Sequence, residues 1–287
     1  MGIALAEKRG GEIVSCDSTA VYRGFDIGTD KVPLADQRGI PHHLVDVVDP
    51  TEEYTAARFA RDAVVAIEAI QSRGRLPILV GGTGLYYRAL ARGLFPGPAA
   101  DVRLRARLET IAARRGLAFL HRLLTRVDPA SATRILLGDR KRMIRALEVY
   151  FQTGIPLTEH FASTVSPLQG YHVISVALSP PRELIAERVR ARVDAQFERG
   201  LMDEIRGLLA RGVPEDARPF GGLVYRQALE LLHGVRSEDE TRELIARENR
   251  RYARRQLIWF RKEPNLVWLQ TSGETPEALA ASEALLS

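Results

Sequence analysis

Short apolar runs alternate with longer helical patterns along most of this chain, and this alternation constrains the fold more than any other feature. The runs that have the composition of buried strands span residues 12–16, 43–47, 77–80, 173–178 and 266–269. Residues 54–70 carry an apolar stripe at helical spacing, and Gly74 and Pro77 end it before the third run. The pattern predicts an α/β protein with a parallel sheet, in which residues 54–70 form a crossover helix.

The strand pattern disappears between residues 96 and 170. The turn Phe95-Pro96-Gly97-Pro98 introduces this region, and amphipathic helical segments fill it. We therefore predict a discontinuous α/β core over residues 1–95 and 171–287, and an all-helical insert over residues 96–170. The tail after Thr271 is expected to form a small peripheral helix.

Residues 1–11 have the pattern of the back half of a helix. Lys8 and Arg9 occupy its last turn, Gly10 and Gly11 stop it, and no N-cap residue precedes it. The pattern predicts that the chain enters this helix midway.

The composition indicates a globular protein of a reducing compartment. At 287 residues and 45% hydrophobic, the chain can bury a substantial core. Its one cysteine, Cys16, excludes an internal disulfide, and its place at the end of a strand favours a role as core filler over one as nucleophile. No apolar run approaches the roughly twenty residues of a membrane span, and no signal-peptide pattern is present. We therefore expect a soluble, cytoplasmic protein.

The charge of +5 permits binding to a polyanion, and the placement of the arginines says more than the total. Arginines gather in residues 134–145, 182–199 and 247–261. Acidic residues interleave with those of 182–199, as on a solvated helix face. In residues 139–145 the basic excess is local, which favours contact with nucleic acid.

Two polar motifs follow predicted strands directly. Asp17-Ser18 comes after residues 12–16, at the strand end where open α/β sheets place their ligand crevices. Thr83 comes after residues 77–80, in a loop that Gly81, Gly82 and Gly84 make compact enough for close approach to a ligand. Two plainer alternatives stay open, namely that Asp17 only caps a turn and that the glycines only serve a tight one.

Four stretches of the chain together resemble the bacterial tRNA dimethylallyltransferases, the tRNA isopentenyltransferase or IPP transferase family: residues 15–31, 79–87, 142–149 and 254–261. The resemblance runs in order from Met1 to about residue 270. It implies a nucleotide-kinase-like core of the P-loop NTPase type with a helical insert. It also implies transfer of a dimethylallyl group from dimethylallyl diphosphate to N6 of the adenosine 3′-adjacent to the anticodon, with release of diphosphate. The partners so implied are tRNA and dimethylallyl diphosphate, with no membrane, for a protein expected to be a monomer.

The resemblance assigns roles to particular residues. Asp17 is implied as the base, Thr83 as a substrate contact and Arg192 as the diphosphate ligand, and these form the expected catalytic set. Arg188 lies four residues before Arg192 on one helix face and is assigned to the diphosphate with it. The residues expected to contact tRNA are Asp17, Ser18, Thr19, Ala20, Thr83, Arg105, Lys141, Arg142, Met143, Ile144 and Arg145. Weaker candidates for substrate or RNA contacts are Thr29, Lys31, Tyr225 and Arg226.

One part of the family pattern does not occur in this sequence. Family members begin with a strand and a glycine-rich phosphate loop that ends in Gly-Lys-Ser or Gly-Lys-Thr, and the chain contains no such motif. In the family this loop holds the diphosphate and a Mg²⁺ ion, so Mg²⁺ is implied for a complete member while its usual ligand is absent here. We expect either a truncated start or a chain that lost the loop. In both cases the first strand, central in the sheet, is expected to be missing and to leave unpaired backbone.

Two rival functions remain open. The chain could be a catalytically inactive tRNA-binding protein that lacks the phosphate loop, or a small-molecule kinase of similar fold, which the absent loop disfavours. No metal site of the protein's own is predicted, because adjacent histidines such as His42 and His43 project in different directions from an extended chain.

Overall fold

The computed structural model describes residues 1–95 and 97–286. The chain divides into two compact units, a core of Met1–Ala91 with Gly170–Ser287 and an insert of Arg92–Gln169. These boundaries lie close to the predicted ones at 95/96 and 170/171. Pro96, part of the predicted entry turn, lies outside the described residues.

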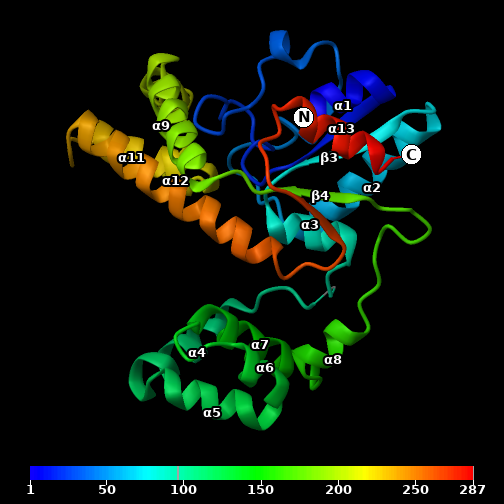
Figure 1. The fold of residues 1–287 in the computed structure, drawn as a ribbon. Helices are drawn as coiled ribbons and strands as arrows, with labels where there is room; N and C mark the ends of the chain where they lie inside the picture. The colour runs from blue at the N-terminus through cyan, green and yellow to red at the C-terminus, as the bar shows by residue number, and fades with distance from the viewer. Residues whose placement is uncertain (96, 287) are drawn as a thin grey trace. The chain divides into compact units, whose positions relative to one another are not determined.

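The strands of the core form two parallel sheets (Figure 1). In the first, β1 (Gly11–Cys16) pairs with β2 (His42–His43) on one side and with β3 (Leu76–Gly81) on the other. In the second, β4 (Ser175–Leu178) pairs with β5 (Leu266–Leu269). Each of the five predicted runs overlaps a strand, and each pairing is parallel as expected.

The single sheet expected from the sequence is present as two pieces. Among the described residues, β3 ends one sheet and β4 ends the other, so each keeps an unpaired edge. β3 has the continuous apolar composition of an interior strand, yet Val80 is 39% exposed.

β2 is shorter than the predicted run over residues 43–47. Leu44 and Asp46 have left-handed backbone conformations, with φ of 62° and 55°, which no strand continues through. The N–H groups of Val47 and Val48 donate instead to the carbonyl of Val21. The segment after β2 therefore packs on the loop that follows β1.

The helices of the first half of the core follow the sequence pattern. α1 (Gly2–Arg9) ends at Gly10, whose φ of 62° suits glycine and whose N–H donates to the carbonyl of Ala6. α2 (Ala56–Ser72) is the predicted crossover helix and begins at Thr55, whose side chain accepts from the Arg58 N–H. It packs on α3 (Gly84–Ala91).

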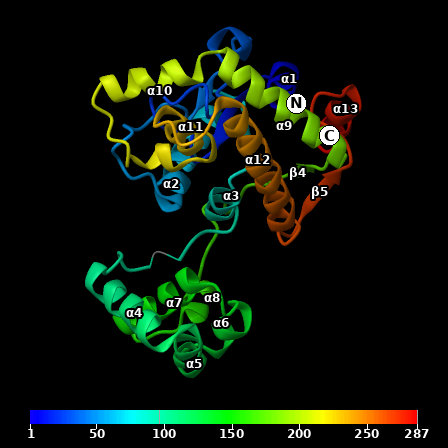
Figure 2. The ribbon, with the colours of Figure 1, turned by 90° about the vertical axis from the view of Figure 1, so that its left-hand side faces the viewer.

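The second half of the core is mostly helical and surrounds one long helix. α9 (Arg182–Glu198), α10 (Leu201–Ala210) and α11 (Leu223–Leu232) precede α12 (Glu238–Phe260), and α13 (Pro276–Ala284) is the predicted peripheral helix. A capping box between Ser237 and Glu240 starts α12. The helix then runs beside both α9 and α11, as Figures 1 and 2 show.

Tyr225 belongs to the packing of this half of the core. Its ring meets Phe25 edge-on at 4.8 Å. Its hydroxyl accepts from the Gly28 N–H at 2.9 Å and donates to Glu204 at 2.5 Å. Because this side chain is buried, the prediction that Tyr225 contacts RNA is wrong.

The insert is a helical unit, as predicted. It contains α4 (Val102–Arg115), α5 (Leu117–Val127), α6 (Pro129–Arg134), α7 (Arg140–Thr153) and α8 (Leu157–Ala162). Met143 and Ile144 lie in its hydrophobic core and are 0% and 4% exposed. Their predicted contact with RNA is therefore corrected, because these side chains hold α7 against its neighbours.

A buried carboxylate organises the insert beside this core. Glu148 on α7 is 0% exposed and accepts hydrogen bonds from Arg105 at 2.8 and 3.0 Å, from Arg145 at 2.7 Å and from the Asp101 N–H at 2.8 Å. Burial alone would raise the pKa of Glu148, but these hydrogen bonds outweigh it and lower the pKa below its usual value. Glu148 thus ties the start of α4 to α7.

Candidate active site

The carboxyl ends of β1 and β3 bring the two polar motifs together. The Ser18 N–H donates to Thr83 Oγ1 at 3.1 Å, the Thr83 hydroxyl donates to Ser18 Oγ at 3.4 Å, and the Thr83 N–H donates to the Cys16 carbonyl at 3.2 Å. Neighbouring parallel strands end at the same edge of their sheet, so motifs that follow them directly must meet. Asp17, Ser18 and Thr83 therefore form one site.

The two oxygens of Asp17 have different surroundings. Oδ1 accepts hydrogen bonds from the Thr19 N–H at 2.7 Å, the Thr19 hydroxyl at 2.6 Å and the Ala20 N–H at 3.3 Å. From the part of the chain that the structure describes, no hydrogen bond reaches Oδ2. Turn capping is thus the role of Oδ1, while Oδ2 remains available to a ligand.

Cys16 lies directly beneath this site. It is buried, and burial together with the nearby charge of Asp17 raises the pKa of its thiol to about 12. A neutral thiol is a poor nucleophile, so the prediction of a core-filling role is confirmed.

Glycines at the end of β3 and directly after it allow neighbouring elements to pack closely on the site. A Cβ at Gly81 would lie 2.3 Å from the Cys16 carbonyl oxygen, one at Gly82 would lie 2.3 Å from Gln256 Nε2, and one at Gly84 would lie 2.5 Å from the Trp259 ring. Gln256 Nε2 donates to the Gly82 carbonyl at 2.9 Å. The loop is therefore compact because β1 and α12 both pack on it.

One face of α12 makes these contacts. Tyr252, Gln256 and Trp259 follow one another at spacings of four and three residues, which places them on a single face. Sequence analysis did not assign Tyr252 or Gln256 to the site. The available signal was this helical spacing of uncharged side chains in an otherwise basic segment.

Replacing Gly84 by alanine tests the packing of α12 on this loop. We expect a loss of about 1–3 kcal/mol in the free energy of unfolding, because the new methyl group displaces the Trp259 ring. Gly221→Ala is the control, since no atom lies within 4 Å of a Cβ there. Urea denaturation monitored by tryptophan fluorescence measures both, and equal stability of the two variants would contradict the packing.

The two arginines assigned to diphosphate reach different partners. Arg192 lies 2.7 Å from the Asp30 carboxylate, which Arg199 also contacts at 2.9 Å, while Arg188 lies 2.6 Å from Glu274. The structure thus does not gather Arg188 and Arg192 at one position, and no contact among the described residues links Arg192 with Asp17. Both arginines are partly exposed, so an anion of higher charge can replace the carboxylates in these ion pairs.

The ammonium group of Lys31 holds together the loop that follows β1. Its ammonium donates to the Tyr22 carbonyl at 2.6 Å and pairs with Asp26 at 2.7 Å and Asp46 at 2.5 Å, and its side chain is 7% exposed. The Thr29 hydroxyl donates to the Phe25 carbonyl. The prediction that Lys31 contacts substrate is wrong, because the loop after β1 uses its charge.

The predicted RNA contacts of the insert differ in availability. Lys141 and Arg142 are exposed near the start of α7, where Arg142 pairs with Asp139 at 3.0 Å. Arg105 and Arg145 are half-exposed and share Glu148. Lys141 and Arg142 are therefore the basic side chains of this group that a polyanion reaches without disturbing the buried carboxylate.

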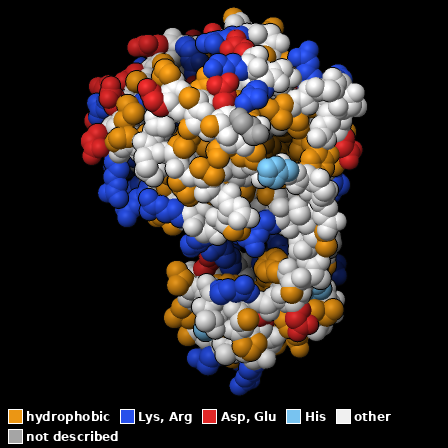
Figure 3. Space-filling model, turned by 45° about the vertical axis from the view of Figure 1, so that its right-hand side comes forward, with side chains coloured by type: hydrophobic (Ala, Val, Ile, Leu, Met, Phe, Trp, Pro, Cys, Tyr) orange, Lys and Arg blue, Asp and Glu red, His pale blue; other side chains and the backbone are white. Residues whose placement is uncertain are grey.

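Further arginines line a cleft between the start of α9 and the C-terminal half of α12. It has a volume of about 480 Å³ and lies over the apolar side chains Ile185, Leu257 and Ile258. We call it the arginine cleft, after the four that line it: Arg182, Arg250, Arg254 and Arg261. No acidic residue lines it, and among the described residues none of the four forms an ion pair. On the face that Figure 3 draws, Lys and Arg side chains gather in clusters with hydrophobic side chains between them.

The arginine cleft and the Asp17 site use opposite faces of α12. Arg250, Arg254 and Arg261 recur at spacings of four and seven, which places them on one face of the helix. At 100° per residue this face points away from the one that carries Tyr252 and Gln256.

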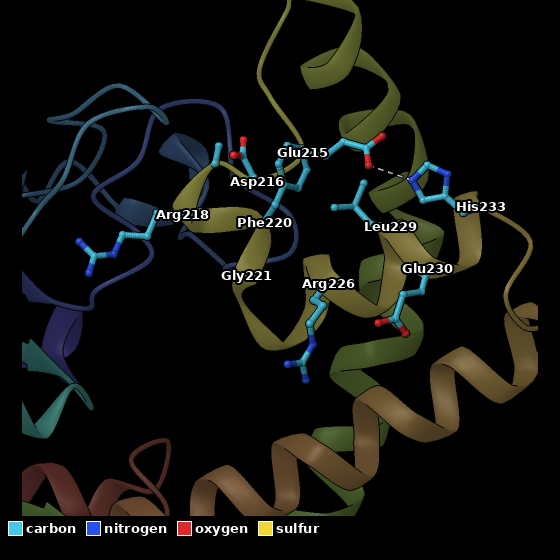
Figure 4. Close-up of a pocket in the computed structure, with 10 residues that line it drawn as sticks. Glu215, Asp216, Arg218, Phe220, Gly221, Arg226, Leu229, Glu230 and His233 are labelled. Carbon is cyan, nitrogen blue, oxygen red and sulfur yellow. Dashed lines mark hydrogen bonds and ion pairs between the residues drawn. The ribbon is translucent and has the colours of Figure 1, made fainter. Parts of the chain in front are cut away.

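A second pocket lies between η2 (Arg218–Gly221) and α11 (Figure 4). Its volume is about 380 Å³ and its lining has mixed charge. Glu215 and His233 pair across it at 3.0 Å, and Arg218 and Arg226 point away from that pair. Arg226 thus lines a pocket with acidic residues, which is less favourable for RNA than the arginine cleft.

The donor set for a metal ion is sparse. The described residues contain no group of three or more His, Cys, Asp or Glu side chains that could hold an ion. His43 instead contacts the buried Glu12 at 2.7 Å, and a ring nitrogen of His42 lies 2.8 Å from the Ile40 carbonyl oxygen. The described residues therefore offer no Mg²⁺ cage made of protein side chains alone. No helix in the described ranges has the length and apolar character needed to cross a membrane.

Comparison with known proteins identifies the family. The family model described as IPP transferase matches residues 20–263. The tRNA dimethylallyltransferase of Solibacter usitatus is 48% identical over 96% of this chain and 90% of its own length, and that of Koribacter versatilis is 43% identical over 99% and 92%. The crystal structure of the tRNA isopentenylpyrophosphate transferase from Bacillus halodurans is 36% identical, with a TM-score of 0.72 over 99% of this chain and 89% of that one. A eukaryotic dimethylallyltransferase acting on tRNA is 28% identical, with a TM-score of 0.80 over 99% and 73%. With a match of this extent, the chain belongs to the IPP transferase family.

Proposed function

We propose that this protein transfers a dimethylallyl group from dimethylallyl diphosphate to N6 of the adenosine 3′-adjacent to the anticodon of tRNA. The observation that carries the proposal is the Asp17 site: a turn fixes one carboxylate oxygen and leaves the other without a hydrogen bond, and the next residue, Ser18, donates its N–H to Thr83. The names of the relatives support transfer of a dimethylallyl group to tRNA. In this proposal the core is of the nucleotide-kinase-like type that the resemblance implies.

Asp17 acts as the base. As N6 attacks the first carbon of the dimethylallyl group, a new C–N bond forms and the C–O bond to the diphosphate breaks. The diphosphate leaves with the electron pair, and Oδ2 of Asp17 accepts the proton that N6 loses. The hydrogen bonds from Thr19 and Ala20 fix the direction of this carboxylate, so positioning supplies much of the effect.

Arg192 is our candidate for stabilising the departing diphosphate. A guanidinium matches the geometry of phosphate oxygens, and its pairing with Asp30 is exposed enough to be exchanged for them. If bound with the diphosphate, Mg²⁺ would supply further neutralisation of its charge.

The tRNA backbone binds to basic surfaces on both units. In the core this surface is the arginine cleft, and in the insert it is Lys141 and Arg142. Arginines without carboxylate partners are free to neutralise phosphates, and this term dominates affinity for nucleic acid.

A transfer assay tests the proposal. Purified protein is incubated with radiolabelled dimethylallyl diphosphate and unmodified tRNA, and label is expected in the adenosine next to the anticodon. A tRNA in which guanosine replaces that adenosine is the control. Binding of tRNA without any transfer of label would favour the inactive RNA-binding protein instead.

Removing two arginines from the cleft is expected to weaken tRNA binding and its dependence on salt. Each lost contact to a single-stranded phosphate lowers the slope of log K against log salt by about 0.7. The double variant Arg250→Gln, Arg254→Gln should therefore bind more weakly at low salt, with a smaller slope. Arg206→Gln is the control, because Arg206 pairs with Asp203 on α10, outside the cleft. Filter binding at several salt concentrations measures the tRNA affinity of both variants. An unchanged slope in the double variant would show that the arginine cleft does not contact the RNA backbone.

A further inference from the structure

Tyr252 occupies a fixed position at the edge of the Asp17 site. It lies one turn before Gln256, whose amide donates to the Gly82 carbonyl, and Trp259 packs at Gly84 on the same face of α12. These two contacts set the rotation of the helix about its axis. Tyr252 lies on the same face of α12, which packs on the loop that follows β3. Burial, followed by the nearby charge of Asp17, raises the pKa of the Tyr252 hydroxyl, which agrees with this placement.

The ring of Tyr252 is accessible, unlike most aromatic side chains of the core. It is 37% exposed, whereas Phe59, Tyr86 and Tyr225 are buried. The guanidinium of Arg255 lies 5.6 Å from the centre of the Tyr252 ring, a separation at which the cation is attracted to the ring. A partly exposed aromatic ring beside a polar site, with an arginine on one of its faces, is the type of surface on which nucleic-acid bases stack.

We propose that Tyr252 is the stacking surface that holds the target adenine in front of Asp17. This inference rests on the proposed function. A base that reacts at its exocyclic amine must leave the stack of the RNA loop, and an aromatic face replaces part of the stacking that it loses. With the ring of the adenine on Tyr252, its amino group is directed to the oxygen of Asp17 that carries no hydrogen bond.

The test compares two anticodon stem-loop RNAs, one with adenosine and one with an abasic residue at the target position. The stacking of one base on an aromatic side chain corresponds to about 5- to 150-fold in affinity. The wild-type protein is therefore expected to prefer the adenosine RNA by a factor in this range. Tyr252→Leu is expected to reduce the preference to near one, while Tyr252→Phe and Tyr252→Trp keep it. Tyr171→Leu, a partly exposed tyrosine of the same unit, is the control and should keep the preference.

Three results would overturn the inference: no preference in the wild type, a preference that survives Tyr252→Leu, or a Tyr252→Phe variant that loses as much as Tyr252→Leu. If the Leu variant does not fold, the absence of a preference in the wild type, or its loss in Tyr252→Phe, still overturns the inference. Because this readout is binding alone, it is separate from the transfer assay. If the wild type transfers the label and the Tyr252→Leu variant still prefers the adenosine RNA, the stacking role is wrong and the proposed function stands. If the preference for the adenosine RNA depends on Tyr252 but no label is transferred, the stacking role stands and the proposed function is wrong.

Discussion

An Asp17→Asn variant is expected to transfer the dimethylallyl group about 10²- to 10⁴-fold more slowly than the wild type, with nearly unchanged affinity for tRNA. The side-chain oxygen of asparagine can still accept the hydrogen bonds from Thr19 and Ala20, so the turn after β1 survives. The amide in place of Oδ2 cannot accept a proton. Single-turnover transfer and tRNA binding, measured side by side, separate these two effects.

The chain offers a matched control for this change. Asp49 makes the same turn as Asp17, because its Oδ1 accepts from the Thr51 N–H at 3.0 Å and from the Thr51 hydroxyl at 2.7 Å. Asp49→Asn therefore makes the same chemical change in the same local structure outside the site, and should leave transfer unchanged. If Asp17→Asn lowers tRNA affinity and turnover by the same factor, Asp17 is a binding residue and another group is the base.

A Glu148→Ala variant is expected to destabilise the insert by about 3–5 kcal/mol. The change leaves the guanidinium groups of Arg105 and Arg145 and the N–H of Asp101 without their shared acceptor beside the hydrophobic core. Hydrogen exchange of the amides in α4 and α7 measures the effect. Glu159→Ala, at an exposed position in the same unit, should change stability by less than about 0.5 kcal/mol. Equal protection of these amides in both variants would show that the cluster does not hold the insert together.

The same carboxylate gives the insert a dependence on pH. Because the pKa of Glu148 in the folded protein is below its ordinary value of 4.5, its ionisation stabilises the fold above that value. This stability is lost as the pH falls below 4.5 and through the lowered pKa. Glu148→Ala should therefore abolish part of the acid sensitivity of the insert, measured by the same exchange experiment.

The sequence predicted those features that depend on local order. Asp17-Ser18 and Thr83 each follow an apolar strand directly, and the geometry of parallel strands then brings them together. The burial of Met143 and Ile144 was also visible in principle, since they share helical spacing with Leu147. The resemblance over residues 142–149 assigned both to the RNA surface instead.

Features that depend on distant partners could not be predicted. Lys31 is buried because Asp46 and the Tyr22 carbonyl converge on it, and no local pattern encodes that convergence. Arg188 and Arg192 share a helix face by spacing, yet their long side chains diverge toward Glu274 and Asp30. For α12, the helical spacing of Tyr252, Gln256 and Trp259 marks a face that packs, but not its partner, because β1 and β3 lie far away along the chain.

Because the arginine cleft and the Asp17 site lie on opposite faces of α12, this helix sets the distance between them. With a helix diameter of about 10–12 Å, a fixed thickness separates the arginine cleft from the Asp17 site. A shift of α12 by one residue would rotate both faces by 100° and advance both by 1.5 Å, so neither can be adjusted alone. An RNA that contacts both faces must have a distance between its backbone and its target base that matches the diameter of the helix. A loop in which this distance is shorter or longer would contact only one of the two faces.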